Sequence, residues 1–221
     1  TLGAHDQKEM GFFFRELGAL ILRVTVPGAN VIIASNPLLS HLITSELSVS
    51  GLEVRGMIVR LVTTLRGGDR PKNAHLEFPG VSVMPRSRHE PWIVLRHPLD
   101  GRVQDNLRRW RTGGFRRISN DLPFSDVIVS NPAGRAERTL APHPSIKPQA
   151  FMRQIVRAAL PLGEGVVLDP FAGSGSTLAA ANAVGYDSIG VERDKTWFSL
   201  AKSAIEPLSR FPVGEKNPSF A

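Results

Sequence analysis

The sequence predicts an α/β protein in which helices cover a mainly parallel β-sheet. Short apolar runs typical of buried strands alternate with amphipathic helical segments along most of the chain. Near the C-terminus, the stretch VVLDPFAGSGSTLAAANAVG (residues 166–185) passes from a strand through a glycine-rich turn into a helix. With 221 residues, 42% of them hydrophobic and 21% charged, the chain can form one full-sized domain with its own core.

The first part of the chain predicts two helices and three strands. We expect a helix over 8–26, a strand over 30–34, a helix over 37–49, a long strand or a broken pair over 52–65, and a strand over 92–96. The first helix carries apolar residues at helical spacing, and Pro27 and Gly28 follow it as a stop signal. The segment before the last strand is rich in Gly and Pro and predicts a loop.

Regular structure is interrupted in the middle of the chain and then returns. Residues 99–144 have no sustained hydrophobic period and predict a loop-rich insertion. After it we expect a helix over 148–160, a strand over 165–168, a helix over 176–184, a strand over 188–191 and a helix over 195–205. The chain therefore divides into one half of the sheet over 1–98, the insertion over 99–145, and the other half of the same domain over 146–221.

The charge of the chain is strongly basic and unevenly distributed. The formal net charge is +7, and residues 86–117 contain nine arginines against three acidic residues. Arginine clusters are typical of phosphate contacts, and a solvated basic surface is the alternative interpretation. The absence of cysteine fits a cytoplasmic protein, and no apolar run reaches the ~18 residues of a membrane span. The six histidines lack metal-like spacing, so no metal is expected.

The glycine-rich turn predicts a binding site for a nucleoside. Gly173 and Gly175 can adopt positive φ and let a ligand approach the free N–H groups at the start of a helix. Asp169 ends the strand before the turn, and Glu192 ends the next strand, nineteen residues after Gly173. An acidic residue at about this distance from a glycine turn holds ribose hydroxyls in dinucleotide-binding folds.

The details of the turn favour a cationic cofactor over a pyrophosphate. The turn lacks the lysine of a phosphate-binding loop, and Leu178 replaces the third glycine of the dinucleotide motif. The carboxylate of Asp169 would repel a pyrophosphate but suits an amino or sulfonium group, and S-adenosylmethionine carries both. The alternative is that the glycines only shape a tight turn between strand and helix.

Three motifs together resemble a known family. DPFAGSGST (169–177), GVERD (190–194) and HPSIKPQAFMRQIV (143–156) are similar to the cofactor motifs of DNA amino-methyltransferases, which modify N6 of adenine or N4 of cytosine. Their order resembles the permuted β-type enzymes. The resemblance implies a Rossmann-like S-adenosylmethionine-dependent methyltransferase sheet with a loop-rich target-recognition insertion, which residues 66–145 would contain.

The resemblance also implies which residues surround the cofactor. The turn and methionine side would consist of Asp169, Phe171, Gly173, Gly175 and Ser176. Glu192 would bind the ribose, Arg193 and Asp194 would lie near the adenine, and Lys147, Pro148 and His143 would close the methionine end. For Lys147 the alternative is a solvated lysine at a helix start, and the role of His143 is equally open.

The catalytic motif of that family is absent. It consists of Asp, Asn or Ser, then Pro-Pro, then an aromatic residue, and it orients the target amine and stacks on the flipped base. The chain has no Pro-Pro, and its single tyrosine is Tyr186. SNPLL (35–39) and SNPAG (130–134) have one proline and no aromatic residue, so we interpret them as structural. We expect the catalytic motif upstream of Thr1 and no catalytic residue in this chain.

Two segments predict contacts with double-stranded DNA. Both are rich in cationic side chains, and the second adds aromatic residues that could stack or wedge; the candidate residues are Arg66, Arg70 and Lys72 in one segment, and Arg108, Arg109, Trp110, Arg111, Phe115, Arg116 and Arg117 in the other. If Arg108, Arg109 and Arg111 contact phosphates, neutralising them flattens the salt dependence of DNA binding by about one unit of slope per lost contact.

The sequence therefore predicts a cytoplasmic DNA methyltransferase, or part of one, acting as a monomer or homodimer in a restriction–modification system. Two alternatives remain. The same cofactor fold could modify RNA, since a fold does not fix function. The chain could also be a non-catalytic remnant that binds DNA or cofactor.

Overall fold

The computed structural model describes residues 4–62 and 68–214. Its helices in these ranges are α1 (Ala4–Val24), α2 (Ser40–Val49), α3 (Val103–Trp110), α4 (Arg135–Leu140), α5 (Gln149–Ala159), α6 (Ser176–Val184) and α7 (Lys195–Ser209). Its strands are β1 (Asn30–Ala34), β2 (Glu53–Leu61), β3 (His89–Arg96), β4 (Val127–Val129), β5 (Val166–Asp169) and β6 (Asp187–Gly190).

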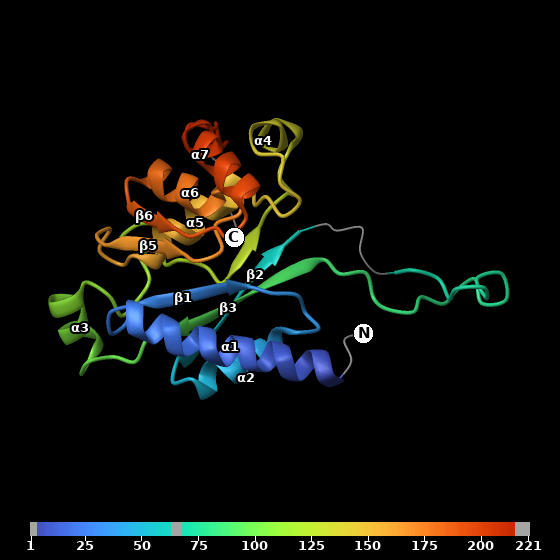
Figure 1. Cartoon of the computed structure of the whole chain (residues 1–221), viewed down its shortest axis with the longest axis horizontal. Coiled ribbons are helices and arrows are strands. Elements are labelled where there is room, and N and C mark those ends of the chain that lie inside the picture. The colour runs from blue at the N-terminus through green and yellow to red at the C-terminus, as the bar shows by residue number, and fades with distance from the viewer. Residues whose placement is uncertain (1–3, 63–67, 215–221) are drawn as a thin grey trace.

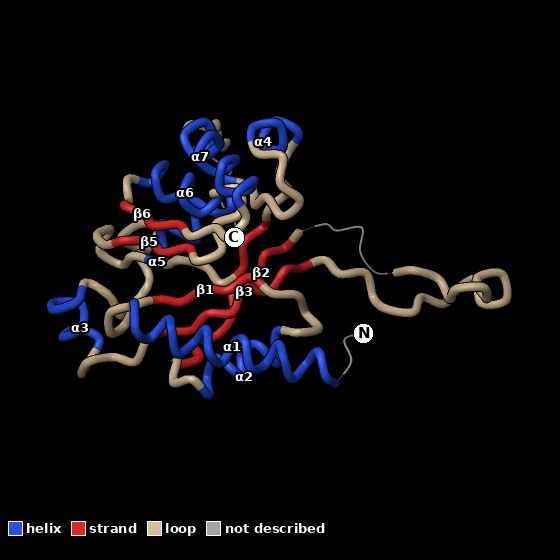
Figure 2. The backbone as a smooth tube through the Cα atoms, viewed as in Figure 1, coloured by secondary structure: helices blue, strands red, loops and turns tan. Residues whose placement is uncertain are grey.

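The described strands form two separate sheets (Figure 2). The larger sheet has the order β1-β3-β2-β4, and the smaller one pairs β5 with β6. Strand β3 is antiparallel to both of its neighbours, whereas β2 is parallel to β4 and β5 to β6. The expectation of a mainly parallel sheet was therefore wrong for the larger sheet. Strands β2 and β3 are consecutive strands that pair directly with each other, as is usual for antiparallel neighbours, whereas parallel neighbours usually need a crossover helix.

Helices cover both faces of the larger sheet (Figure 1). On one face, α1 and α2 pack over a core that includes Ile93 and Leu95 of β3. On the other face, Trp92 and Val94 pack against α5, whose Phe151 is fully buried. Successive side chains of β3 therefore point into two different cores, one on each face of the sheet, as expected for a strand buried on both faces.

The elements around the smaller sheet follow local sequence signals. Helix α6 begins after Gly175 and ends before Gly185, and both glycines have left-handed backbone conformations. Helix α5 begins directly after Pro148, whose ring fixes the φ of this N-cap residue at −67°. Asp194 caps α7 by accepting hydrogen bonds from two backbone N–H groups.

The two ends of the sheets carry different segments. At the amino ends of β1 and β5, the side chain of Asn30 donates to the carbonyl of Gly114, and Arg111 pairs with Glu164, so α3 and the loop after it lie there. At the opposite end, residues 68–88 between β2 and β3 project from the body of the molecule as a long arm (Figure 1). A hydrogen bond from Gly68 N–H to the carbonyl of Met84 joins the two sides of this arm.

The predicted elements outside the insertion are confirmed with small shifts of their ends. The stretch 99–145 is loop-rich, as expected, but it also contains α3, β4 and α4, which were not predicted because each is too short to show a period. Residues 63–65 of the expected strand 52–65 lie outside the described residues. No helix in the described ranges combines the length and apolar composition that crossing a membrane requires.

Candidate functional site

The glycine turn after β5 is closed by hydrogen bonds to two carboxylates. Asp169 accepts a hydrogen bond from the N–H of Phe171 at 3.0 Å. Gly173 has φ +52°, and its N–H donates to Oε2 of Glu192 at 2.8 Å. The two acidic strand ends singled out in the sequence therefore meet at one turn, as the parallel pairing of β5 and β6 requires.

Glu192 is held as an ionised hydrogen-bond acceptor. Its Oε1 accepts the N–H of Asp194 at 2.8 Å. Hydrogen bonds from the backbone N–H groups of Asp194 and then Gly173 lower the pKa of Glu192 below its ordinary value. Each carboxylate oxygen still has a lone pair available, so the group can accept hydrogen bonds from ribose hydroxyls.

His143 lies against the same turn. A Cβ atom added at Gly173 would come within 3.3 Å of the imidazole ring, so a side chain there would crowd His143, and the positive φ of Gly173 also favours glycine. The ring also packs edge-on against Trp197, with 4.5 Å between ring centroids. His143 is thus positioned by the turn and by α7, which explains why a histidine from the loop before α5 reaches the cofactor motif.

Lys147 also reaches the turn, but its ammonium is already engaged. Its backbone N–H donates to Oγ of Ser176 at 3.4 Å, at the first residue of α6. Its Nζ donates to Oε1 of Glu90 and lies 5.8 Å from the ring centroid of Trp92. Lys147 is therefore a held side chain rather than a freely solvated one.

Glu90 and Arg60 were missed by the sequence analysis. Arg60 donates to Oε2 of Glu90 at 2.8 Å and to the carbonyl of Asn131 at 2.8 Å. Burial alone would raise the pKa of Glu90, but hydrogen bonds and charges from Lys147 and Arg60 outweigh it and lower that pKa. The available signal was a charged residue in each of two apolar strands, because charged residues are rarely buried unless paired.

The buried side of the turn is polar. Ser174 and Ser176 place their hydroxyls 3.2 Å apart. Gln149 is fully buried and donates to the carbonyl of Ser176 at 3.0 Å, while its Oε1 has no partner among the described residues. Pro148 is buried at the start of α5. A polar donor and acceptor set of this kind suits a zwitterionic ligand better than an apolar one.

Four other expected site residues have local roles. Phe171 is 60% exposed, and its ring centroid lies 6.2 Å from that of Phe13 on α1. Gly175 has φ +78°, and a Cβ atom there would lie 2.6 Å from Ile205 of α7. Asp194 caps α7, and Arg193 is exposed beside it.

The first predicted DNA-binding segment forms part of the arm. Arg66 lies outside the described residues. Arg70 and Lys72 are exposed and make no ion pair within the described parts of the chain. The arm also exposes apolar side chains, with Leu76 85% exposed. It leaves the body at the carboxyl end of β2, next to Glu90 and Lys147, and so at the same end as the glycine turn.

The second segment forms α3 and the loop after it, at the opposite end of the sheets. Three of its arginines form ion pairs with acidic residues at 3.2, 2.8 and 2.9 Å; the pairs are Arg108–Asp105, Arg109–Asp100 and Arg111–Glu164. The indole of Trp110 donates to the same Asp100 carboxylate at 3.2 Å. Arg116 donates to the hydroxyl of Tyr186 at 2.8 Å, so the single tyrosine of the chain is also engaged.

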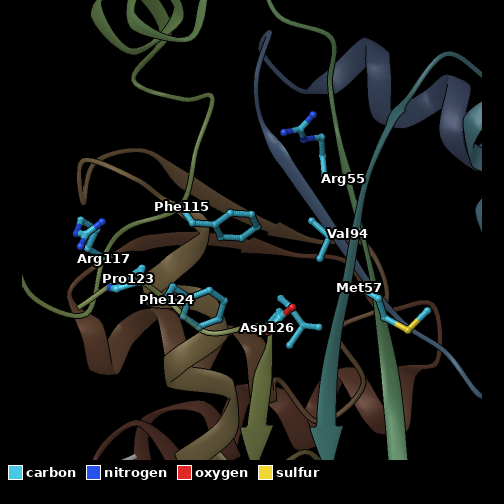
Figure 3. Close-up of a pocket in the computed structure, with 10 residues that line it drawn as sticks. Arg55, Met57, Val94, Phe115, Arg117, Pro123, Phe124 and Asp126 are labelled. Atoms are coloured by element: carbon cyan, nitrogen blue, oxygen red, sulfur yellow. The ribbon is translucent and has the colours of Figure 1, made fainter. Parts of the chain in front are cut away.

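Phe115 and Arg117 line a cavity of about 320 Å³ (Figure 3). Phe115 stacks on Phe124 with 5.7 Å between centroids, and Met57 and Val94 of the sheet lie across the cavity from them. The ring of Phe115 is therefore packed inside the fold.

The two single-proline sequences take part in hydrogen bonds that fix the local structure. The side chain of Asn36 accepts hydrogen bonds from the N–H groups of Leu38 and Leu39, each at 3.0 Å, which fixes the turn before α2. Asn131 receives the hydrogen bond from Arg60 described above. Among the described residues no group of three or more acidic or histidine side chains is arranged to hold a metal ion.

Comparison with solved structures defines the class of fold. The complex of M1.HpyAVI with SAM matches 90% of this chain and 84% of its own with a TM-score of 0.65, at 22% identity. The PvuII DNA methyltransferase, which is cytosine-N4-specific, matches 92% of this chain and 73% of its own with a TM-score of 0.62, at 12% identity. The fold is the Rossmann-like α/β fold of S-adenosylmethionine-dependent methyltransferases.

Sequence comparison then places the chain in a family. A family model described as DNA methylase matches residues 86–203, more than half of the chain. The chain belongs to this DNA methylase family. It is similar to the Type II methyltransferase M2.DpnII of Streptococcus pneumoniae, with 28% identity over 42% of this chain and 34% of the relative. It is also similar to M.ScaI of Streptomyces caespitosus, with 34% identity over 38% of this chain and 26% of the relative. These matches span about a third or less of each relative.

Proposed function

We propose that the chain is part of a DNA methyltransferase that modifies the exocyclic amine of adenine or cytosine. One observation carries the proposal: the glycine turn of β5 is bounded by an ionised Glu192 on one side and by His143 and Lys147 on the other. Membership of the DNA methylase family supports the choice of substrate. The relatives are Type II methyltransferases, which supports a role in restriction–modification. The absence of cysteine fits a cytoplasmic protein.

The residues around the turn fit S-adenosylmethionine. Glu192 would accept hydrogen bonds from the ribose, and Asp169 would face the cationic part of the cofactor. The imidazole ring of His143 would lie beside the cofactor, because it packs against Gly173 of the turn. When bound, the cofactor supplies the sulfonium methyl group that the nitrogen of the base amine attacks directly.

We also propose that the group orienting the target amine lies in polypeptide outside the 221 residues. The two sheets share no hydrogen bond among the described residues, so β1 and β5 each keep one unpaired edge. The face of β5–β6 exposes apolar side chains, with Val166 54% and Ile189 57% exposed. An additional strand could pair with the free edges of β1 and β5 and cover the apolar face of β5–β6. If it carried Asp, Asn or Ser followed by Pro-Pro and an aromatic residue, it would also supply the group that orients the target amine.

The first experiment is nucleoside mass spectrometry. Unmethylated DNA is incubated with labelled S-adenosylmethionine and either this chain or a longer natural chain that contains it. We expect labelled N6-methyladenine or N4-methylcytosine with the longer chain, and binding without transfer from the 221 residues alone. Absence of cofactor binding by both chains would contradict the proposal, and label in RNA instead of DNA would favour the RNA alternative.

A further inference from the structure

The carboxylate of Glu90 is shared between two cations from different parts of the chain. One oxygen accepts from Arg60 on β2, and the other accepts from Lys147 at the start of α5. Arg60 is itself fixed, because its guanidinium also donates to the Asn131 carbonyl and lies 5.0 Å from the ring centroid of Phe151. The position of the carboxylate is therefore set by the sheet, and the carboxylate sets the position of the lysine.

The cluster lies between the base of the arm and the start of α6. Arg60 and Glu90 are opposite each other in the β2–β3 ladder, at the base of the arm. The backbone of Lys147 contacts Ser176, directly after the glycine turn. The cluster itself, with two cations and one carboxylate, carries one net positive charge. A site with that charge favours an anionic group such as the carboxylate of an amino acid.

We infer that Glu90 is a positioning residue, which holds the Lys147 ammonium beside the glycine turn so that the cluster recognises the amino-acid carboxylate of the methionine part of the cofactor. The inference rests on the proposed function and deepens it. It assigns to Glu90 a role that acts through Lys147, with Arg60 as the anchor.

The ladder contains a matched control for this inference. Glu53 and Arg96 form a second cross-strand pair between β2 and β3, at the other end of the same ladder. Nε and one terminal nitrogen of Arg96 donate to Oε2 of Glu53 at 3.0 and 2.5 Å. Glu53→Gln therefore weakens an equivalent ion pair of the sheet without touching Lys147.

The test measures binding of two ligands by calorimetry. S-adenosylhomocysteine contains the amino-acid carboxylate, whereas 5′-methylthioadenosine lacks it. We expect Glu90→Gln to weaken S-adenosylhomocysteine binding about tenfold, because a hydrogen bond to a charged group contributes about that much. Binding of 5′-methylthioadenosine should stay unchanged in this variant, and Glu53→Gln should leave both affinities unchanged. If Glu90→Gln does not fold, Glu90→Asp serves instead, with a smaller loss confined to S-adenosylhomocysteine.

The possible outcomes separate the inference from the proposed function. Equal weakening of both ligands would assign Glu90 a purely structural role, and unchanged or tighter S-adenosylhomocysteine binding would mean that Glu90 does not position the lysine for the ligand. Each of these results overturns the inference and leaves the proposed function intact. A wild-type chain that binds neither ligand would overturn the proposed function.

Amine-reactive labelling adds a readout without cofactor: Lys147 should be protected in the wild type and in Glu53→Gln, and labelled faster in Glu90→Gln.

Discussion

At the scale of single residues, the glycines that bound α6 have different physical roles although their backbones are alike. Gly175 has φ +78° and Gly185 has φ +80°. A Cβ atom at Gly175 would lie 2.6 Å from Cγ1 of Ile205, whereas one at Gly185 would have no neighbour within 4 Å. Gly175 therefore makes room for α7, in addition to any contact with a ligand.

Alanine substitutions separate the cost of a left-handed backbone from the cost of crowding Ile205. We expect Gly185→Ala to lower the free energy of unfolding by about 1–2 kcal/mol, the cost of a left-handed backbone. Gly175→Ala should lose about 1–3 kcal/mol more, because the added methyl group overpacks the contact with Ile205. Urea unfolding measures both variants. Equal losses would show that the contact with α7 does not limit the size of residue 175.

At the scale of elements, the start of α7 depends on one side chain. Asp194 Oδ1 accepts hydrogen bonds from the N–H groups of Thr196 and Trp197 at 2.8 and 3.0 Å. Trp197 in turn packs on His143, so the cap connects the helix start to the glycine turn. We expect Asp194→Ala to lower the free energy of unfolding by about 1 kcal/mol and Asp194→Asn to leave it nearly unchanged, since asparagine is an equally good cap.

Thermal or urea unfolding of both Asp194 variants tests the cap. Comparable losses in the two variants would mean that the negative charge matters rather than the hydrogen bonds. Cofactor binding by Asp194→Asn then tests the separate expectation that this residue lies near the adenine.

At the scale of the whole molecule, the two basic segments lie at opposite ends of the sheets. The arm leaves beside the glycine turn, whereas α3 contacts the amino ends of β1 and β5 (Figure 1). A base flipped from DNA has to reach the turn, so we propose that the arm contacts DNA there. The expectation that the α3 arginines bind phosphates remains untested, but each already has an acidic partner.

The salt dependence of DNA binding distinguishes the two segments. We expect neutralising Arg70 and Lys72 to lower the salt slope by about two units, one for each phosphate contact. Neutralising Arg108, Arg109 and Arg111 removes more charge, yet should leave the slope unchanged because α3 faces away from the turn. The opposite pattern, with the slope changed only by the α3 variant, would assign DNA binding to α3. Fluorescence anisotropy over a range of salt concentrations measures both, with the longer chain if the 221 residues alone bind weakly.

The sequence by itself determined the cofactor half of the molecule. The turn DPFAGSGST, the boundaries of α6 and the placement of Asp169 and Glu192 at that turn follow from glycine and carboxylate positions within about 25 residues of one another. Such local signals are readable because the strand–turn–helix unit is specified by its own residues. The resemblance to DNA amino-methyltransferases, carried by the same motifs, was confirmed at the level of family and fold.

Only the tertiary structure decided the remaining features. The antiparallel β3, the short β4 within the insertion and the shared carboxylate of Glu90 depend on residues 28 to 71 positions apart in the chain. The same is true of α3, whose exposed arginines resembled a phosphate-binding surface until their acidic partners and their distance from the turn were seen. Sequence patterns report which residues a segment contains, whereas pairing partners and the end of the sheet that a loop occupies are fixed by packing between segments.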